Sequence, residues 1–148
     1  MPFFPRARFF LLAPALIACM AHAQAPEWIA AKQNEPGRTT YIKAGSVQRS
    51  KRGVTVWLKY QFEEPLVVKE FNATVPMMME KAEYSADRKW SLRILMYDAS
   101  GKQVVDHSNP PGNAGAELIP ETTEAAQAQQ VWALAPKGKK STAAKAGH

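Results

Sequence analysis

Few residues of this chain can take part in chemistry, and the rarest of them is Cys19, its single cysteine. Cys19 follows the small and apolar run Leu16–Ala18, a spacing that predicts a lipoprotein box whose cysteine becomes a lipidated N-terminus. The overlapping Ala21–Ala23 forms an A-x-A cleavage site that would release a chain beginning at Gln24. Because the two signals exclude each other, we expect cleavage after Ala23 and keep lipidation at Cys19 as the alternative.

Cleavage after Ala23 would leave a mature chain without cysteine, and therefore without a disulfide, a thiolate nucleophile or a cysteine-bound metal. Histidine is scarce as well, because His22 lies in the removed segment and His148 is the last residue. His107 remains beside Asp106, which an extended strand would place on the opposite face. A catalytic triad or a histidine metal site would depend on this one imidazole, so we interpret His107 as an ordinary residue near a strand end.

Three consecutive methionines, Met77 to Met79, form an unusual cluster, and thioethers are ligands for Cu(I). On a strand, Met77 and Met79 would share one face and Met78 would occupy the other. A copper site would therefore need Met96 or His107 as well. We favour packing for these flexible side chains and keep copper binding as an alternative.

The acidic residues do not converge on a catalytic pair. Glu63, Glu64, Glu80 and Glu83 are scattered along the chain, whereas glycoside hydrolysis needs two facing carboxylates. The sequence contains neither a P-loop nor a dinucleotide-binding fingerprint. It therefore predicts a protein that is not an enzyme, with no catalytic residue, no cofactor and no metal site.

The elements that must carry these residues begin after residues 1–23, which we interpret as a signal peptide. Arg6 and Arg8 provide its positive start, and Phe9–Ala18 provides an apolar centre that is too short to span a bilayer. We therefore expect an exported protein of the periplasm or the cell surface. A lipid-anchored form in the envelope is the alternative.

The formal net charge of +6 is concentrated at the two ends of the chain. Residues 24–136, the predicted domain, carry 13 basic and 13 acidic residues, a balance that argues against binding of nucleic acid. Residues 137–148 are rich in Lys, Ala and Gly, which predicts a disordered basic tail. This tail is either merely solvated or makes a weak contact with an anionic surface.

The predicted domain has the alternation of a half-buried antiparallel sheet. The clearest strand covers residues 54–62, where every second residue is apolar: Val54, Val56, Leu58, Tyr60 and Phe62. Shorter extended segments lie on both sides of it, separated by turn signals such as Pro36-Gly37 and Ser50–Gly53. These signals predict an antiparallel meander of about six strands.

A second hairpin is predicted within residues 77–97. We expect a register that pairs Ala82 with Ile94, because a slip by one residue would place charged side chains against an apolar row. The same register sets Glu83 opposite Arg93 as an opposite-charge pair.

One helix is predicted over Glu121–Leu134, because glutamates occupy its first turn, small residues recur along one side and Pro136 ends it. Trp132 is its candidate anchor on the sheet. Trp57 lies on the opposite face of its strand from Val54, so either the helix covers Trp57 or the indole is exposed for binding. We favour the first arrangement.

Five features follow one another along the domain: Trp28, then TTYIKAGSVQR, GVTVWLKY, EYSADRKWSLRILMYDASGKQV and IPETTEAAQAQQVWAL. In this order they resemble the surface-adhesin protein E-like family of Gram-negative envelope proteins, over most of residues 24–136. Members of that family typically carry two cysteines that join the helix to the sheet. Here Ala86 stands near the first position and Val131 or Trp132 near the second. The resemblance therefore implies a helix held by packing.

The resemblance also implies a curved sheet with the helix across one face, pairing of two copies and an adhesin-like role. We therefore expect an α+β domain that acts as a non-enzymatic envelope or cell-surface interaction protein. Its partner would be a host or surface macromolecule, either a protein or a polymer. The alternative is a periplasmic accessory protein that binds a small molecule or copper.

Overall fold

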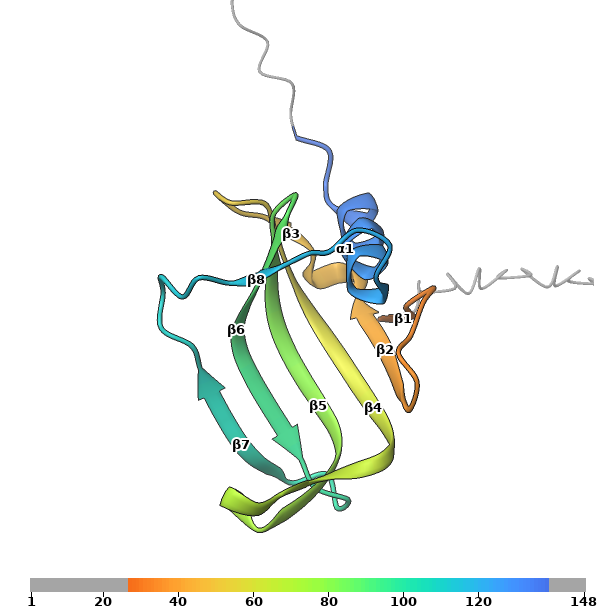
Figure 1. The fold of residues 1–148 in the computed structure, drawn as a ribbon, viewed down its shortest axis with the longest axis vertical. Coiled ribbons are helices and arrows are strands. Elements are labelled where there is room, and N and C mark those ends of the chain that lie inside the picture. The colour runs from red at the N-terminus through yellow and green to blue at the C-terminus, as the bar shows by residue number, and fades with distance from the viewer. Residues whose placement is uncertain (1–26, 139–148) are drawn as a thin grey trace, which may run out of the picture.

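The computed structural model of the chain describes residues 27–138, so the predicted signal peptide, Cys19 and most of the predicted basic tail lie outside the described residues. The described part is an α+β domain, as predicted, with one antiparallel sheet and one α-helix near its C-terminal end (Figure 1). In chain order the elements are β1 (Trp28–Ala30), β2 (Arg38–Lys43), η1 (Ala44–Ser46), β3 (Gln48–Arg49), β4 (Val54–Val68), η2 (Lys69–Phe71), β5 (Ala73–Tyr84), β6 (Arg88–Tyr97), β7 (Gln103–Ser108), β8 (Ala116–Glu117) and α1 (Thr123–Leu134).

The sheet is a curved meander. Its strands lie in the order β1-β2-β4-β5-β6-β7, and all neighbours are antiparallel. The two-residue strands β3 and β8 pair with β4 and β6, respectively. Figure 1 shows α1 against the end of the sheet where β3 and β8 lie, while β4 to β7 extend beyond it. The predicted six-strand meander is therefore confirmed, and β8 adds a two-residue strand between β7 and α1.

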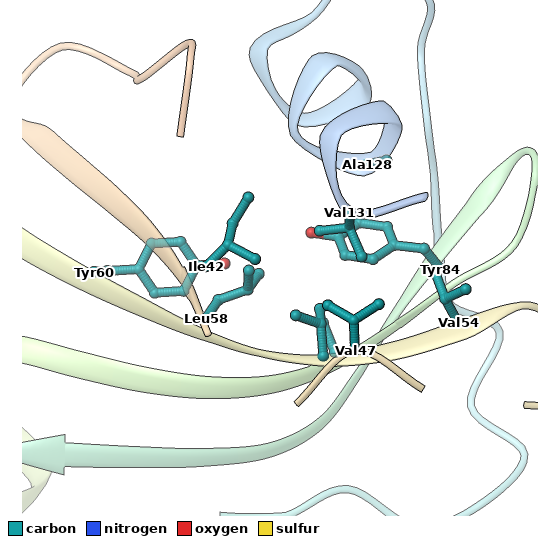
Figure 2. Close-up of a cluster of buried hydrophobic side chains, with 10 residues drawn as sticks. Ile42, Val47, Val54, Leu58, Tyr60, Tyr84, Ala128 and Val131 are labelled. Atoms are coloured by element: carbon teal, nitrogen blue, oxygen red, sulfur yellow. The ribbon is translucent and has the colours of Figure 1, made fainter. Parts of the chain in front are cut away.

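β4 supplies the centre of the hydrophobic core. Val54 and Leu58 are completely buried, on the face that the alternation of β4 predicts. Figure 2 shows Ala128 and Val131 of α1 over this row, with Ile42 of β2 beside it. Burying one valine or leucine side chain stabilises a fold by about 1.5–3 kcal/mol, so this contact is the main apolar attachment of the helix.

The turn before β4 depends on a glycine. The Ser50 N–H donates to the Gly53 carbonyl at 2.9 Å and closes the turn. A Cβ atom on Gly53 would lie 1.9 Å from the carbonyl oxygen of Tyr84 in β5. A side chain at this position would therefore separate the start of β4 from the end of β5.

The hairpin of β5 and β6 exists, but its predicted register is wrong. Ala82 pairs with Ser91 rather than with Ile94, and a bulge follows between Lys81 and Ala82. The bulge adds one residue to β6 and reverses its alternation at that point. The side chains of β6 before and after the bulge therefore do not form the single apolar row that the sequence suggested.

The turn between these strands explains where the register is set. The Ser85 hydroxyl accepts hydrogen bonds from the backbone N–H groups of Asp87 at 3.4 Å and Arg88 at 3.0 Å. The chain thus reverses at residues 86–87, and β6 begins at Arg88. A serine hydroxyl commonly stabilises such a turn.

The predicted Glu83–Arg93 pair does not form. Glu83 stands opposite Trp90, is only 6 % exposed, and forms a salt bridge with Arg52. Arg93 instead donates two hydrogen bonds to Asp106 of β7, at 2.9 Å and 2.7 Å. Both charges are paired, but each pairs with a partner from another part of the chain.

The helix α1 begins two residues later than predicted. Glu121 has a positive φ of 66° and lies outside the helix, and the Thr122 hydroxyl accepts a hydrogen bond from the Ala125 N–H at 3.2 Å. Threonine is a favourable N-cap because its hydroxyl satisfies a free N–H of the first turn. Glu124 occupies the first turn, and the helix ends at Leu134, as predicted.

The expectation that the helix covers Trp57 is wrong. The alternation of β4 puts Val54 and Trp57 on opposite faces, and α1 packs on the Val54 face through Val131. The helix takes that face because its small side chains fit against the apolar row of β4. Trp57 is therefore left half-buried on the opposite face of the sheet.

Two glutamines tie α1 to the β1 end of the domain. The Gln127 amide, which is 2 % exposed, donates to the carbonyl of Gln33 at 2.9 Å. The Gln130 side chain accepts from the Lys32 N–H at 2.9 Å and donates to the Ala30 carbonyl at 3.3 Å. These bonds supplement the packing that the sequence led us to expect.

Candidate functional site

The face of the sheet opposite α1 carries three pairs of an aromatic residue and a lysine. Each pair bridges two neighbouring strands, β1 to β2, β2 to β4 and β4 to β5, and the pairs are Trp28–Lys43, Tyr41–Lys59 and Trp57–Lys81. We call these six residues the aromatic–lysine ladder. All six side chains are partly exposed.

The ladder follows from the period of two along each strand. Tyr41 and Lys43 are two residues apart in β2, and Trp57 and Lys59 are two residues apart in β4, so each strand shows one ring and one ammonium on this face. The Trp57 N–H donates to the Ser46 hydroxyl at 2.8 Å, which attaches η1 to this part of β4.

Two of the three ammonium groups of the ladder, those of Lys43 and Lys59, lie over aromatic rings. The Lys59 Nζ is 4.7 Å from the ring centroid of Trp28 and 4.8 Å from that of Tyr41. The Lys43 Nζ is 5.7 Å from the Trp28 ring and 2.8 Å from Oε1 of the exposed Glu27. Such contacts stabilise a cation by about 0.5–1 kcal/mol at exposed sites, and they hold the lysine side chains in place.

A second polar cluster lies between the first turn of α1 and the other face of the sheet. The Lys89 Nζ is 2.9 Å from Oε2 of Glu80 and 2.8 Å from Oε1 of Glu124. The Tyr60 hydroxyl donates to Glu80 at 2.6 Å and accepts from Lys89 at 3.3 Å. Together with Tyr84, whose ring lies 5.9 Å from the Lys89 Nζ, these residues form the Lys89 cluster.

The opposite charges of the Lys89 cluster stabilise one another in their ionised forms. Burial by itself would lower the pKa of Lys89, but the surrounding tyrosines and the carboxylates of Glu80 and Glu124 outweigh it and raise that pKa well above its usual value. Burial likewise opposes ionisation of Glu80, yet the Lys89 ammonium and the Tyr60 hydroxyl hold the pKa of Glu80 below its usual value. Burial raises the pKa of Tyr84 to about 12.

This charge state indicates what the Lys89 cluster can do. A lysine that acts as a nucleophile or base must lose its proton near neutral pH, which a lowered pKa makes easier. Lys89 has a raised pKa and is bonded to three oxygen atoms. The cluster therefore joins α1 to the sheet by ion pairs, in a chain whose described residues contain no cysteine.

A cleft of about 350 Å³ opens beside the Lys89 cluster. Its walls include Glu80, Lys89, Ser91 and Asn113. The Ser91 hydroxyl is buried there and has no hydrogen-bond partner among the described residues. The other polar side chains of the cleft are paired within it, Lys89 with Glu80 and the Asn113 side chain with the backbone N–H of Gly115.

An apolar groove of about 470 Å³ lies on the other side of α1. Ala125, Ala128 and Trp132 of the helix form one wall, and Leu118 lies on the other. Trp132, the candidate anchor, packs against the core only in part, and its Nε1 is 3.4 Å from the Ser85 carbonyl. The fully buried anchor of the helix is its neighbour Val131.

The remaining candidates from the sequence are not brought together as one site. His107 is exposed, and its Nε2 lies 3.0 Å from Oδ1 of Asn109. Met78 faces Met96 across β5 and β6, whereas Met77 and Met79 occupy the opposite face. Within residues 27–138 no group of three or more His, Cys, Asp or Glu side chains is placed to hold a metal ion.

Sequence reasoning missed the ladder and the Lys89 cluster for different reasons. The ladder needs the registers of four strands, although the alternating TYIK and WLK motifs already contained two of its pairs of neighbours. Lys89 and Glu124 are 35 positions apart and belong to different elements. Only the docking position of α1 brings them into contact.

Comparisons with protein-family models, with curated proteins and with solved structures gave no match for this chain. The resemblance to the surface-adhesin protein E-like family therefore stays a prediction. Across residues 27–138, no helix combines the length and the apolar character that crossing a membrane requires.

Proposed function

We propose that this chain is a non-enzymatic exported interaction protein of the periplasm or cell surface, which binds a host or surface macromolecule in an adhesin-like manner. The observation that carries the proposal is the aromatic–lysine ladder on the face of the sheet that α1 leaves open. Tryptophan and tyrosine are enriched in binding surfaces because their rings offer a large contact area with little loss of conformational freedom.

Two further features support a binding role. The predicted signal peptide would bring the domain to a compartment where surface macromolecules are accessible. Lys89, whose side chain is largely buried, is occupied in holding the helix, and His107 is bonded to a neighbouring asparagine. Neither side chain is arranged as a nucleophile or a general base.

The apolar groove favours a second candidate, a periplasmic accessory protein that binds a small molecule. Its volume of about 470 Å³ lies in the range of about 300–1,000 Å³ that is typical of small-molecule sites. Copper binding has less support, because the register separates Met77 and Met79 from Met78 and Met96.

Intact cells that express the full-length chain distinguish these candidates. The purified protein should retain binding to a surface macromolecule, and in its cell-surface form a membrane-impermeant reagent should modify it on intact cells. The second candidate predicts a different result, in which the protein is labelled only after the outer membrane is opened and a metabolite raises its melting temperature. Labelling that requires lysis of the whole cell would contradict both.

A further inference from the structure

We infer that the partner of the aromatic–lysine ladder is an acidic polysaccharide, that is, a sugar chain with repeated carboxylate, sulfate or phosphate groups. This inference rests on the proposed function and names the class of its partner. It follows from the spacing, the charge and the ring contacts of the ladder, considered in turn below.

The spacing of the ladder suits an extended polymer. Its three lysines lie on β2, β4 and β5, each next to an aromatic ring on the neighbouring strand. Lys81 lies in the cross-strand row of Trp57, whereas Lys59 lies two residues further along β4, in the row of Tyr41 and Met79. Because adjacent strands are about 4.8 Å apart, the ammonium groups are staggered across three strands rather than gathered in a single pocket. Separate, staggered cations match repeated negative groups better than one small anion.

The charge of this face also favours an anionic partner. Lys43 has the exposed Glu27 as its partner, but Lys59 and Lys81 form no salt bridge with any carboxylate of residues 27–138. Two other carboxylates on the same face, Glu83 and Asp106, are already paired with arginines. Lys59 and Lys81 therefore give the ladder two positive charges without an ion-pair partner, although the predicted domain as a whole carries equal numbers of acidic and basic residues.

The ring contacts distinguish a polysaccharide from a nucleic acid. Single-stranded nucleic acids bind by stacking bases on free aromatic faces. Here the Lys59 ammonium already lies over the rings of Trp28 and Tyr41, at 4.7 Å and 4.8 Å. The rings thus hold the Lys59 cation that meets the polymer, and Trp57, next to Lys81 on the neighbouring strand, remains for contact with the apolar face of a sugar.

The test measures binding of the full-length gene product, purified after export, to a single-stranded oligonucleotide and to three soluble polysaccharides. These are polygalacturonate, which carries carboxylates, dextran sulfate, which carries sulfates, and neutral dextran of similar length. The ladder variant is Lys59→Gln/Lys81→Gln. Its matched control is Lys69→Gln/Lys102→Gln, which removes the same charge from exposed lysines in η2 and in the turn before β7.

We expect binding to one or both acidic polymers, weaker binding at higher salt and none to neutral dextran. An ammonium near an anionic surface contributes about 1 kcal/mol, so the ladder variant should lose about 30-fold in affinity. The control variant should lose less than about threefold, because η2 and the turn before β7 lie at the end of the sheet away from β1 and β3 (Figure 1). The acidic polymer that binds more tightly identifies the anionic group.

Three results would overturn the inference. The first is absence of binding to both acidic polymers, and the second is an equal loss in the two variants, which would indicate attraction to net charge alone. The third is tighter binding of a single-stranded oligonucleotide than of either acidic polymer. Binding to cell-surface material without binding to acidic polymers would leave the proposed function intact while refuting this partner class.

Discussion

At the scale of single residues, Lys89 shows how charge holds this fold together. It is one of the few cations with a mostly buried side chain, 12 % exposed, and it contacts two carboxylates from two different elements. The resemblance led us to expect a helix held by packing where family members have a disulfide. In this chain the Glu80–Lys89–Glu124 ion pairs add a second attachment to that packing.

Removing the cation of this cluster should destabilise the domain strongly. Lys89→Met keeps the length of the side chain but leaves Glu80, which is 6 % exposed, without its charged partner. Breaking a buried ion pair from one side costs about 3–5 kcal/mol, and we expect a loss of about 3 kcal/mol in the free energy of unfolding. Urea denaturation checks this, with the exposed Lys51→Met as the control.

The variant Glu80→Gln/Lys89→Met should recover part of that loss, because it removes the isolated buried charge as well. If Lys89→Met and Lys51→Met unfold at the same urea concentration, the ion pairs contribute nothing to the attachment of the helix.

The same cluster predicts how stability depends on pH. Folding lowers the pKa of Glu80 from its usual value of 4.5. The contribution of Glu80 to the free energy of unfolding is therefore present above pH 4.5, and it is lost as the pH falls through the pKa that Glu80 has in the folded protein. Folding raises the pKa of Lys89 above its usual value of 10.5. Its contribution to the free energy of unfolding is therefore present below pH 10.5, and it is lost as the pH rises through the pKa that Lys89 has in the folded protein. The pKa of Tyr84, raised to about 12, adds to the loss at alkaline pH.

We therefore expect a plateau of stability between the two limits and a decline on each side, measured as the free energy of unfolding in urea at a series of pH values. Other carboxylates, such as Asp106, whose pKa is lowered by Arg93, also contribute to the acid decline. The comparison with Glu80→Gln isolates the cluster. An acid decline of the same size in this variant and in the parent chain would assign the effect to other groups.

At the scale of elements, the alternation of apolar and polar residues predicted the strands, but it did not predict the register between β5 and β6 or the face of the sheet on which the helix packs. The period of two in β4 identified its buried row correctly, because one side of that strand faces the core along its first half. It did not determine which face the helix covers, and we expected the helix on the Trp57 face, whereas it packs on the Val54 face. The register of β5 and β6 depended on the Ser85 hydroxyl and on a bulge, and neither changes the hydrophobic pattern.

The aromatic–lysine ladder and the Lys89 cluster also differ in how much of each the sequence could predict. That Tyr41 and Lys43 share a face follows from their spacing, but the pairing of Tyr41 with Lys59 follows from the β2–β4 register. The Lys89 cluster combines β4, β5, β6 and α1, and the sequence contains no local signal for such a meeting.

For the helix, the structure changes the expected effect of substitutions. A fully enclosed tryptophan would cost about 3–5 kcal/mol on replacement by alanine. Trp132 is only partly buried, whereas Val131 is 0 % exposed. We expect Val131→Ala to cost about 2 kcal/mol and Trp132→Ala to cost no more than that, although the second change removes far more atoms.

Chemical denaturation of the two variants, followed by circular dichroism, measures both values. The exposed Ala133→Ser provides a matched change on the outer side of α1. A loss after Trp132→Ala that is several times larger than after Val131→Ala would restore the tryptophan as the principal anchor.

At the scale of the whole molecule, the position of the domain relative to a membrane depends on residues outside the described part. A lipoprotein usually has a flexible polar spacer between its anchor and its domain. Here residues 20–27 are all that separate Cys19 from Trp28, where β1 begins. A ladder whose first residue is Trp28 would then lie close to the bilayer, so we predict a soluble product that begins at Gln24.

Intact-mass measurement of the protein from the cell envelope checks this prediction. The expected mass is that of the unmodified chain from Gln24 onward. A chain that begins at Cys19 and carries a diacylglyceryl group would instead establish the lipid-anchored form.

Gln130 has a further consequence for self-association. Its side chain bonds to both the Lys32 N–H and the Ala30 carbonyl, and so it occupies backbone groups at the β1 edge that a strand from another molecule would otherwise use. The β7 edge is the other end of the strand order and has no such cover among the described residues. The β1 edge is therefore less open than the β7 edge to the addition of a strand from another molecule.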